Sequence, residues 1–471
     1  MSPVATLTRE HLTPVDRAGI GRRARTGVPR SAHAAWRPDP AGRDPLAILA
    51  LQALTREPSL VPIRYGRMAA TPFTFFRGAA AVMAADLATI PRTGLDVQLC
   101  GDAHLLNFGG FGSPERELIF DVNDFDETTP GPFEWDLKRL VVSLEVAARS
   151  RNFTSGERAS ILAQAAHQYR LAIGEFAAMR TLDIWYSKLD RDALAARWGA
   201  EASANAMKSL RRTAAKAESK DRLKALSKLT HEVDGELRFL NDPPLLVPIE
   251  ALFSESDAWD IEDTLRTALR SYRRTLAGDK RHLLAGYRYV HLARKVVGVG
   301  SVGTRCWVAL FIGRDDQDPL FLQVKEAEAS VLEPFVGASR YANHGQRVVE
   351  GQRLMQAASD VLLGWQRTTG ADGVSRDYYM RQLWDWKASA DVDRMSPELL
   401  GVYGQMCAWT LARSHARSGD PIAISSYLGA GDSMDRALAE FAAGYADQNE
   451  RDHRALTGAI ASGAIEADTT C

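Results

Sequence analysis

The apolar residues of the chain repeat at helical spacing in some regions and form short runs in others, and the two patterns predict different elements. Over 133–180 they recur every three or four residues, which predicts amphipathic helices. The same pattern predicts further helices over 45–56, 77–89, 257–276, 344–365, 396–419 and 433–454. Apolar runs between turn residues predict strands at 95–100, 118–120, 289–297, 306–312, 320–325 and from 378 onwards. We therefore expect an α+β fold.

Two regions depart from these patterns. Residues 1–43 mix Arg, Pro and Gly without periodicity, so we expect a loosely ordered arm. The helix predicted over 197–228 is mostly polar and rich in basic residues. A basic face suits an anionic partner, but a helix face in contact with water has the same composition. The sequence leaves both interpretations open.

Length and composition narrow the class of protein. A chain of 471 residues is long enough for two or three domains. Hydrophobic residues make up 45% and charged residues 25%, as in an ordinary globular protein, and the net charge of -1 gives no reason to expect nucleic acid. No apolar run approaches the roughly 20 residues that cross a bilayer, and the N-terminal region lacks the apolar core of a secretory signal. We expect a cytoplasmic protein without membrane contact.

The cysteines support the same expectation. They are scattered and form no Cys-x-x-Cys pair: Cys100, Cys306, Cys407 and Cys471. Such a pattern predicts neither a zinc site nor a disulfide framework, and it fits a reducing compartment.

The residues best suited to catalysis or metal binding lie in one stretch, 99–126. It contains Asp102, His104 and Asn107, then an apolar run, then Asp124 and Asp126. A carboxylate, a carboxamide and a second carboxylate around a loop and a β-hairpin suit phosphoryl transfer. Asp102 would accept a hydroxyl proton, and Asn107 with Asp124 would hold magnesium. Asp126 is a further candidate ligand, and His104 would either organise the loop or act at the phosphate.

The order Gly-Asp-x-His-x-x-Asn followed by Asp-Phe-Asp resembles the catalytic loop and metal-binding segment of the aminoglycoside phosphotransferase and choline kinase branch of the kinase-like fold. Asp136, in the motif Glu-Trp-Asp-Leu, resembles the residue that braces this loop in those enzymes. The resemblance implies ATP and Mg²⁺ as cofactors. It also implies a small hydroxylated acceptor.

A glycine-rich phrase, Gly-Val-Gly-Ser-Val-Gly at 298–303, joins two predicted strands. A dinucleotide-binding phrase would open a helix instead, so the position favours the flap that covers ATP phosphates in kinases. The residues expected to close over the phosphates are Gly298, Gly300, Ser301 and Gly303.

Lys325 lies inside the apolar run 320–325, where a cation needs an anion. The resemblance makes it the lysine that touches the α and β phosphates. Its expected ion-pair partner is Glu350 on the following helix, while Glu328 and Glu333 remain candidates. The stretch 378–387 would be the connector between lobes, whose backbone would bind adenine.

Three arginines lie among aromatic residues nearer the N-terminus: Arg64, Arg67 and Arg77. They would either clamp phosphate or carboxylate groups or lie over the aromatic rings.

The motifs occur in permuted order, because the expected catalytic segment 99–126 precedes the glycine-rich flap 298–303 and Lys325. Starting the chain after about 285 would restore the order of the kinases that it resembles, and such permutation is physically permissible. We therefore expect a bilobal, circularly permuted kinase-like fold. Its β-rich nucleotide-binding lobe would span 285–390, and its helical lobe would combine 44–284 with 391–471.

The whole chain, from about 25 to 450, resembles the bacterial family named domain of unknown function 2252. The resemblance rests on phrases at 62–68, 75–78, 101–104, 123–126 and 294–303. No reaction is established for that family, so its name supplies no substrate.

The expected activity is an ATP- and Mg-dependent phosphotransfer to a hydroxyl group. One alternative is a non-catalytic nucleotide-binding module. A second is a metal-dependent phosphohydrolase, with Asp102, His104, Asp124 and Asp126 converging on shared ions. A third is transfer of AMP with the nucleotide turned around. The acceptor and the oligomeric state stay open, and the distance from Lys325 to Asp124 is the cheapest test of the common site.

Overall fold

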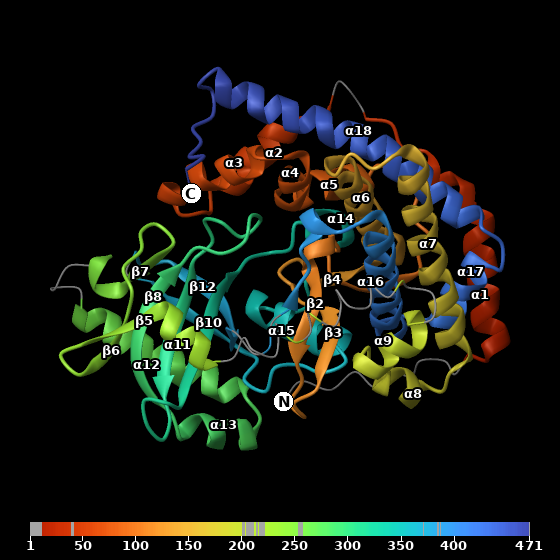
Figure 1. Cartoon of the computed structure of the whole chain (residues 1–471). Coiled ribbons are helices and arrows are strands. Elements are labelled where there is room, and N and C mark those ends of the chain that lie inside the picture. Colours follow the sequence, from red (N-terminus) through yellow and green to blue (C-terminus); the bar gives the residue numbers. More distant parts are fainter. Residues whose placement is uncertain are drawn as a thin grey trace.

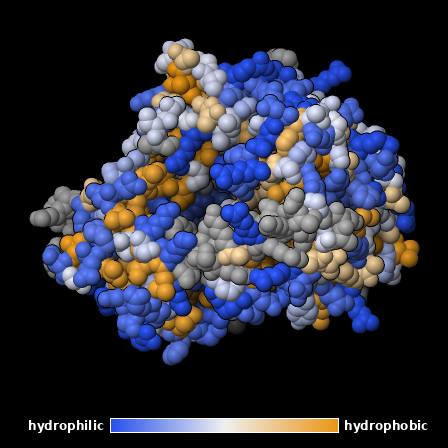
Figure 2. All heavy atoms as spheres, viewed as in Figure 1, coloured by the Kyte–Doolittle hydropathy of each residue, from blue (hydrophilic) through white to orange (hydrophobic). Residues whose placement is uncertain are grey.

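The computed structural model describes residues 12–38, 42–199, 203, 212, 215, 222–252, 258–370, 372–383, 386 and 388–470. The fold is a mixture of helices and antiparallel sheets. In Figure 1 a β-rich part lies at the left, and helices fill the right and the upper edge. Hydrophilic and apolar residues are interspersed on the face shown in Figure 2, as on most protein surfaces. No helix among the described residues is long and apolar enough to span a bilayer.

The β-rich part is built on one six-stranded sheet with the order β11-β12-β10-β9-β8-β7. All neighbouring strands in it are antiparallel. The strands are β7 (Leu246–Pro248), β8 (Arg288–Lys295), β9 (Cys306–Ile312), β10 (Pro319–Ala327), β11 (Gly364–Thr369) and β12 (Ser375–Gln382). Five of them fall in the expected range 285–390, but β7 comes from before it.

Side chains alternate along β10 and separate the two faces of the sheet. Leu320, Leu322 and Val324 belong to an apolar cluster with side chains of α12 and α13. Phe321 points to the other face, into a cluster with side chains of α11 and β6, and Lys325 lies on that same face. These covering elements are α11 (Arg222–Leu229), β5 (Thr230–Val233), β6 (Glu236–Phe239), α12 (Ala258–Thr275) and α13 (Gly278–Ala285).

The helix expected over 344–365 is shorter than its pattern suggested. It is α15 (His344–Met355), and the apolar residues after it enter β11 instead. Asp360 fixes the intervening loop, because its carboxylate accepts hydrogen bonds from the backbone of Leu362 and Gln382. A short apolar run does not distinguish a helix end from a strand, and pairing with β12 decides the outcome here.

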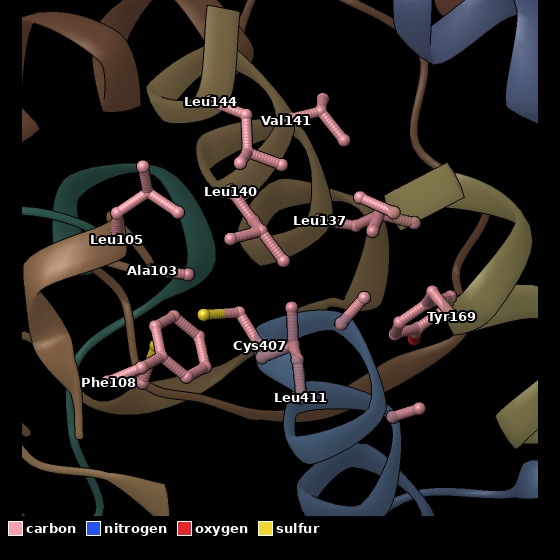
Figure 3. Close-up of a cluster of buried hydrophobic side chains, with 14 of the residues drawn as sticks. Ala103, Leu105, Phe108, Leu137, Leu140, Val141, Leu144, Tyr169, Cys407 and Leu411 are labelled. Atoms are coloured by element: carbon pink, nitrogen blue, oxygen red, sulfur yellow. The ribbon is translucent and has the colours of Figure 1, made fainter. Parts of the chain in front are cut away.

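The helical part packs around α6 and α16. The stretch 99–126 contributes to this core through Ala103, Leu105 and Phe108, which lie beside side chains of α6 and α16, with Tyr169 of α7 in the same cluster (Figure 3). The loop that carries Asp102 is thereby fixed by apolar packing. The larger helices are α6 (Phe133–Ser150), α7 (Ser155–Ala178), α16 (Pro397–Ser418), α17 (Pro421–Leu428) and α18 (Ser433–Ala461).

The N-terminal region differs from the expected loose arm. Residues Pro14–Gly27 form helix α1, which docks on α17. Arg17 Nε and Nη2 each donate a hydrogen bond to the Asp420 carboxylate at 2.8 Å. Arg25 Nε donates to the carbonyl of Tyr427 at 2.9 Å. These partners lie some 400 positions away in sequence, so local periodicity could not reveal them.

Four short helices follow and lie beneath α18 (Figure 1). They are α2 (Pro45–Ala53), α3 (Val61–Ala69), α4 (Pro72–Gly78) and α5 (Ala80–Leu87). The basic helix expected over 197–228 is described only at its ends, in α9 (Arg191–Trp198) and α11. Most of its middle, and residues 384, 385 and 387 of the expected connector, lie outside the described residues.

Candidate functional site

Residues 100–126 follow β1 (Asp96–Leu99), which pairs with β4 (Thr129–Pro132). The carboxylate of Asp136 on α6 accepts hydrogen bonds from the backbone of Cys100 at 2.8 Å and Gly101 at 3.0 Å. Gly101 has φ +85°, and a side chain there would meet the carbonyl of Glu127 at 2.3 Å. Asp136 therefore braces the loop, and glycine is required at the turn.

Asp102 is held by a residue that the sequence did not single out. Arg139 Nε donates to Asp102 Oδ1 at 2.9 Å, while its Nη2 donates to the carbonyl of Phe76 at 2.6 Å. Asn107 Nδ2 also donates to the backbone carbonyl of Asp102 at 2.8 Å. Burial raises the pKa of Asp102, and the Arg139 guanidinium opposes that rise. An arginine one helical turn after Asp136 was the only signal in the sequence.

His104 acts on its own loop. Its Nδ1 accepts a hydrogen bond from the backbone of Leu106 at 3.2 Å, and its Nε2 lies 3.7 Å from Asp102 Oδ2. Burial, together with Arg77 and Arg139, holds the pKa of His104 well below its ordinary value. The imidazole is therefore neutral at physiological pH.

A β-hairpin brings the second acidic group beside the first. Strands β2 (Phe108–Gly112) and β3 (Leu118–Val122) pair so that Phe108 lies opposite Val122. The backbone of Asn123 then donates to the carbonyl of Asn107 at 2.8 Å, which places Asp124 next to Asn107. The hairpin register thus converts a long sequence separation into proximity.

Lys325 reaches this acidic segment from β10. Its ammonium forms an ion pair with Asp126 and lies 3.9 Å from Asp124 Oδ2. Tyr379 on β12 donates to Asp126 Oδ1 at 2.8 Å, and Ser301 donates to Asp126 Oδ2 at 3.3 Å. Only 2% of Lys325 is exposed, so these carboxylates are what keeps a buried cation stable.

The pKa directions follow from this arrangement. Burial and the neighbouring Asp126 raise the pKa of Asp124. Burial alone would raise the pKa of Asp126, but Lys325 and Tyr379 outweigh it and lower the pKa. Burial would likewise lower the pKa of Lys325, but the two carboxylates raise it. The ammonium and at least one carboxylate are therefore charged together.

Glu350 does not pair with Lys325, and that expectation was wrong. Its carboxylate lies on the outer side of α15, 3.4 Å from Arg353. Arg347 of the same helix faces inward instead, and donates to the carbonyls of Asp126 at 2.7 Å and Glu328 at 2.7 Å. The helix is thus attached to the acidic segment by a cation, and Asp126 takes the role expected of a glutamate on α15.

The glycine-rich flap rests on the N-terminal helices. Arg67 donates to the carbonyl of Gly298 at 2.8 Å, and the backbone of Glu57 donates to the carbonyl of Gly303 at 2.8 Å. Val299 and Val302 are buried in apolar clusters with residues of α2 and α3. These contacts fix the flap in place, and no local pattern in the sequence predicts them.

One cavity of about 540 Å³ joins these pieces. It is lined by five of the predicted residues of the catalytic phrase: Asp102, His104, Asn107, Asp124 and Asp126. Gly298, Gly300 and Ser301 also line it. Gly303 is not part of the lining; it lies against the side chain of Arg56. Lys325 is not part of the lining either; it is buried and paired with Asp126.

The oxygen donors in this cavity fit magnesium. Asn107 uses its amide nitrogen to bind the loop, which directs its carbonyl oxygen elsewhere. Asp124 and Asp126 add carboxylates, and Mg²⁺ commonly takes one or two carboxylates together with phosphate oxygens and water. Among the described residues, no three His, Cys, Asp or Glu side chains are grouped closely enough to hold a metal ion by themselves. The arrangement therefore suits an ion shared with a ligand.

The three arginines that the sequence places among aromatic residues, Arg64, Arg67 and Arg77, make different contacts. Arg64 is buried and structural, since it donates to Gln52 at 2.9 Å and to the carbonyl of Gly78 at 3.2 Å. Arg67 holds the flap. Arg77 lines the cavity, and its buried Nε has no hydrogen-bond partner.

The fold and this site define an α+β protein with an acidic, arginine-containing cavity between a sheet and a helical part. Residues 56–459 match the DUF2252 family, described as uncharacterized proteins conserved in bacteria. The chain belongs to this family. No match was found among curated proteins or among solved structures.

Proposed function

We propose that this protein is an ATP- and Mg-dependent phosphotransferase of the kinase-like type that acts on a hydroxyl group of a small acceptor. The observation that carries the proposal is the 3.9 Å separation of Lys325 and Asp124. They come from segments about 200 positions apart in the sequence, and the kinase-like assignment requires them to meet. Asp102 and the flap line the same cavity.

Each residue would have one task. Asp102 would orient the acceptor hydroxyl or take its proton, and Lys325 would bind phosphate oxygens. Asn107, Asp124 and Asp126 would hold Mg²⁺, which supplies charge neutralisation at the phosphates when bound. The backbone of 298–301 would close over the phosphates.

The order of elements in the sheet supports the kinase-like interpretation. The glycine-rich segment joins the first two strands of the meander β8-β9-β10, and Lys325 lies on the third strand. Helix α15 follows, as a kinase-like small lobe requires.

The contacts of α16 support the permuted order. Tyr403 on α16 donates to the carbonyls of Leu105 at 2.8 Å and Phe108 at 3.0 Å. In the rearranged order α16 comes before this loop, as in the kinases that the chain resembles, with α17, α18 and α1–α5 between the two. The contact supports the permuted order, because it brings α16 against the loop despite this separation.

A metal-dependent phosphohydrolase is less well supported. It needs Asp102, His104, Asp124 and Asp126 around shared ions, but among the described residues no three His, Cys, Asp or Glu side chains are grouped closely enough to hold a metal ion. It also leaves the flap and the buried lysine without a task. A non-catalytic nucleotide-binding module uses the same contacts as the kinase, so activity has to separate these two.

The experiment compares wild type with Asp102→Asn and Asp124→Asn, and uses Asp315→Asn in the exposed β9–β10 turn as the control. Binding of Mg-ATP is measured by calorimetry and turnover by ATP consumption. Asp124→Asn should weaken binding at least tenfold, whereas Asp102→Asn should retain binding and lose about a hundredfold in turnover. Binding without turnover for any acceptor would favour the module, and no Mg-dependent binding would refute the proposal.

A further inference from the structure

Arg77 is a cation on the wall of the cavity that has no partner among the described residues. It lies in the last turn of α4 and lines the same cavity as Asp102. Its guanidinium forms no hydrogen bond or ion pair with any residue that the structure describes. Arg56, the other arginine of this wall, donates instead to the carbonyl of Val302. The protein therefore leaves the charge of Arg77 unpaired.

The charges around Asp102 do not cancel. Arg139 already supplies the counter-ion of this carboxylate, with its Nε 2.9 Å from Oδ1. Arg77 acts on the same carboxylate from beyond ion-pair distance, and it too opposes the rise that burial causes in the pKa of Asp102. The imidazole of His104 is neutral, because burial and the two arginines lower its pKa. Two guanidinium groups thus face one carboxylate, and this end of the cavity keeps a positive charge.

The other acids of the wall have cations of their own. Lys325 and Arg381 act on both Asp124 and Asp126. Three glutamates also line the cavity, and three arginines act on them: Glu127, Glu326 and Glu328 face Arg56, Arg305 and Arg347. Asp393, an exposed residue before α16, acts on Arg77 but lies outside ion-pair distance. The uncompensated charge therefore belongs to the end of the cavity that holds Asp102.

A guanidinium in this position is suited to an anionic ligand. Arg77 is half-buried, and burial lowers its pKa. A charged group that has lost water without gaining a partner is destabilised, and an oxyanion restores the missing interactions. The planar guanidinium can bind two oxygens of a carboxylate or a phosphate at once. The terminal nitrogens would make these contacts, because Nε is covered by protein atoms.

The surroundings of Arg77 favour the acceptor over the nucleotide as the source of this anion. The proposed sites for the phosphates and Mg²⁺ lie at Lys325 and Asp124, where acids and cations balance. Arg77 acts instead on Asp102, the residue proposed to orient the acceptor hydroxyl or take its proton. We infer that the acceptor carries a carboxylate or a phosphate near its hydroxyl group, and that Arg77 binds it. This inference rests on the proposed function and adds the class of substrate to it.

Anion binding to the complex with Mg-AMP-PNP tests this site before the acceptor is known. The analogue fills the nucleotide site, so inorganic phosphate or acetate, titrated by calorimetry, has to bind elsewhere. Wild type should bind at least one of them, and the stronger ligand indicates which anionic group the acceptor carries. Arg77→Met should weaken this binding about tenfold, and Arg77→Lys should weaken it less. Anion binding that is absent from wild type, or unchanged in Arg77→Met, would overturn the inference.

A matched control removes the same charge elsewhere. Arg394→Met changes an arginine whose side chain is 86% exposed and that does not line the cavity. It should bind phosphate and acetate as wild type does. An equal loss in Arg394→Met and Arg77→Met would show a general effect of net charge and would overturn the inference.

The affinity for Mg-AMP-PNP itself separates this inference from the proposed function. It should be the same in wild type and in all three variants, which also shows that the variants are folded. A loss of about tenfold in Arg77→Met and Arg77→Lys, with unchanged thermal unfolding, would assign Arg77 to the nucleotide phosphates and overturn the inference. If wild type does not bind Mg-AMP-PNP, the proposed function itself fails.

Discussion

At the scale of single residues, the site depends on cations that hold carboxylates in place. Arg139 fixes Asp102, Lys325 fixes Asp126, and Arg347 fixes the backbone between the acidic segment and β10. Each of these charged groups is largely buried, so losing one partner leaves the other uncompensated. The acidic residues were visible in the sequence, but two of their three cationic partners were not.

The Arg139 contact leads to a prediction about pH dependence. Arg139→Gln removes the cation that opposes the burial of Asp102, so the pKa of Asp102 should rise further. The acidic limb of the pH profile of kcat/KM should then move to higher pH, and turnover should fall about a hundredfold. Arg139→Lys should restore part of both effects, because it keeps the charge. A uniform loss of activity at all pH values would indicate a purely structural role.

Lys138 gives a prediction about stability. It is fully buried on α6, its Nζ has no hydrogen-bond partner, and burial lowers its pKa to about 7. Between pH 7 and the ordinary lysine value the unfolded state binds more protons, so the free energy of unfolding should rise with pH across that window. Lys138→Met should be more stable than wild type at pH 7 and should lose a slope of up to about 1.4 kcal/mol per pH unit.

Urea unfolding at pH 7 and pH 9 checks this expectation. Lys280→Met, at an exposed lysine paired with Asp279, is the control and should follow wild type. A Lys138→Met protein that is less stable at pH 7, with an unchanged slope, would contradict the prediction.

At the scale of elements, the glycine-rich flap behaves as part of the N-terminal helical block. Its backbone is held by Arg67 and Glu57, and Val302 is fully buried beside Leu60 and Ile63. If the proposed nucleotide binds here, a segment fixed in this way is already ordered before binding, which reduces the entropic cost of binding. Neither the glycine pattern nor the strand pattern around it indicates this attachment.

Loosening the flap should therefore weaken nucleotide binding. Val302→Ser removes a buried apolar contact, so amide hydrogen exchange over 298–304 should accelerate, and the affinity for Mg-ATP should fall severalfold. Val374→Ser, at a half-exposed position in another turn, should change neither quantity. Faster exchange with unchanged affinity would mean that the flap does not contribute to binding.

At the scale of the whole molecule, three distant segments meet at one buried ion pair. Arg413 on α16 donates to both oxygens of Asp121 on β3, at 2.7 and 2.8 Å, and to the carbonyl of Met355 at the end of α15 at 2.9 Å. Only 1% of either charged residue is exposed. The pair joins the hairpin that carries Asp124 to both the helical part and the helix beside the sheet.

Breaking this pair from one side should be severe. Arg413→Met leaves Asp121 buried without its cation, so the free energy of unfolding should fall by about 3–5 kcal/mol. Adding Asp121→Asn to that variant removes the uncompensated charge and should recover part of the loss. Chemical unfolding of both single variants and the double variant gives the coupling energy. Additive losses would show that the two groups act independently.

The sequence by itself determined the elements with clear periodicity and the chemistry of the central phrase. The α+β class, the hairpin after Asn107 and the helices over 133–180 follow from local spacing, because side-chain period is a property of neighbouring residues. Short sequence motifs also indicated the family, and the match of residues 56–459 to the family model confirms it. The acids of the stretch 99–126 were selected by residue type and order alone, and their chemical role stays a prediction.

The tertiary structure decided which residues meet across the cavity. Glu350 and Arg347 lie one turn apart on the same helix, and only packing selects Arg347 as the inward-facing residue. The docked helix α1, the attachment of the flap and the covering of the sheet by α11 likewise depend on contacts between remote segments. Such contacts are chosen by burial and charge compensation in three dimensions, and no local period in the chain encodes them.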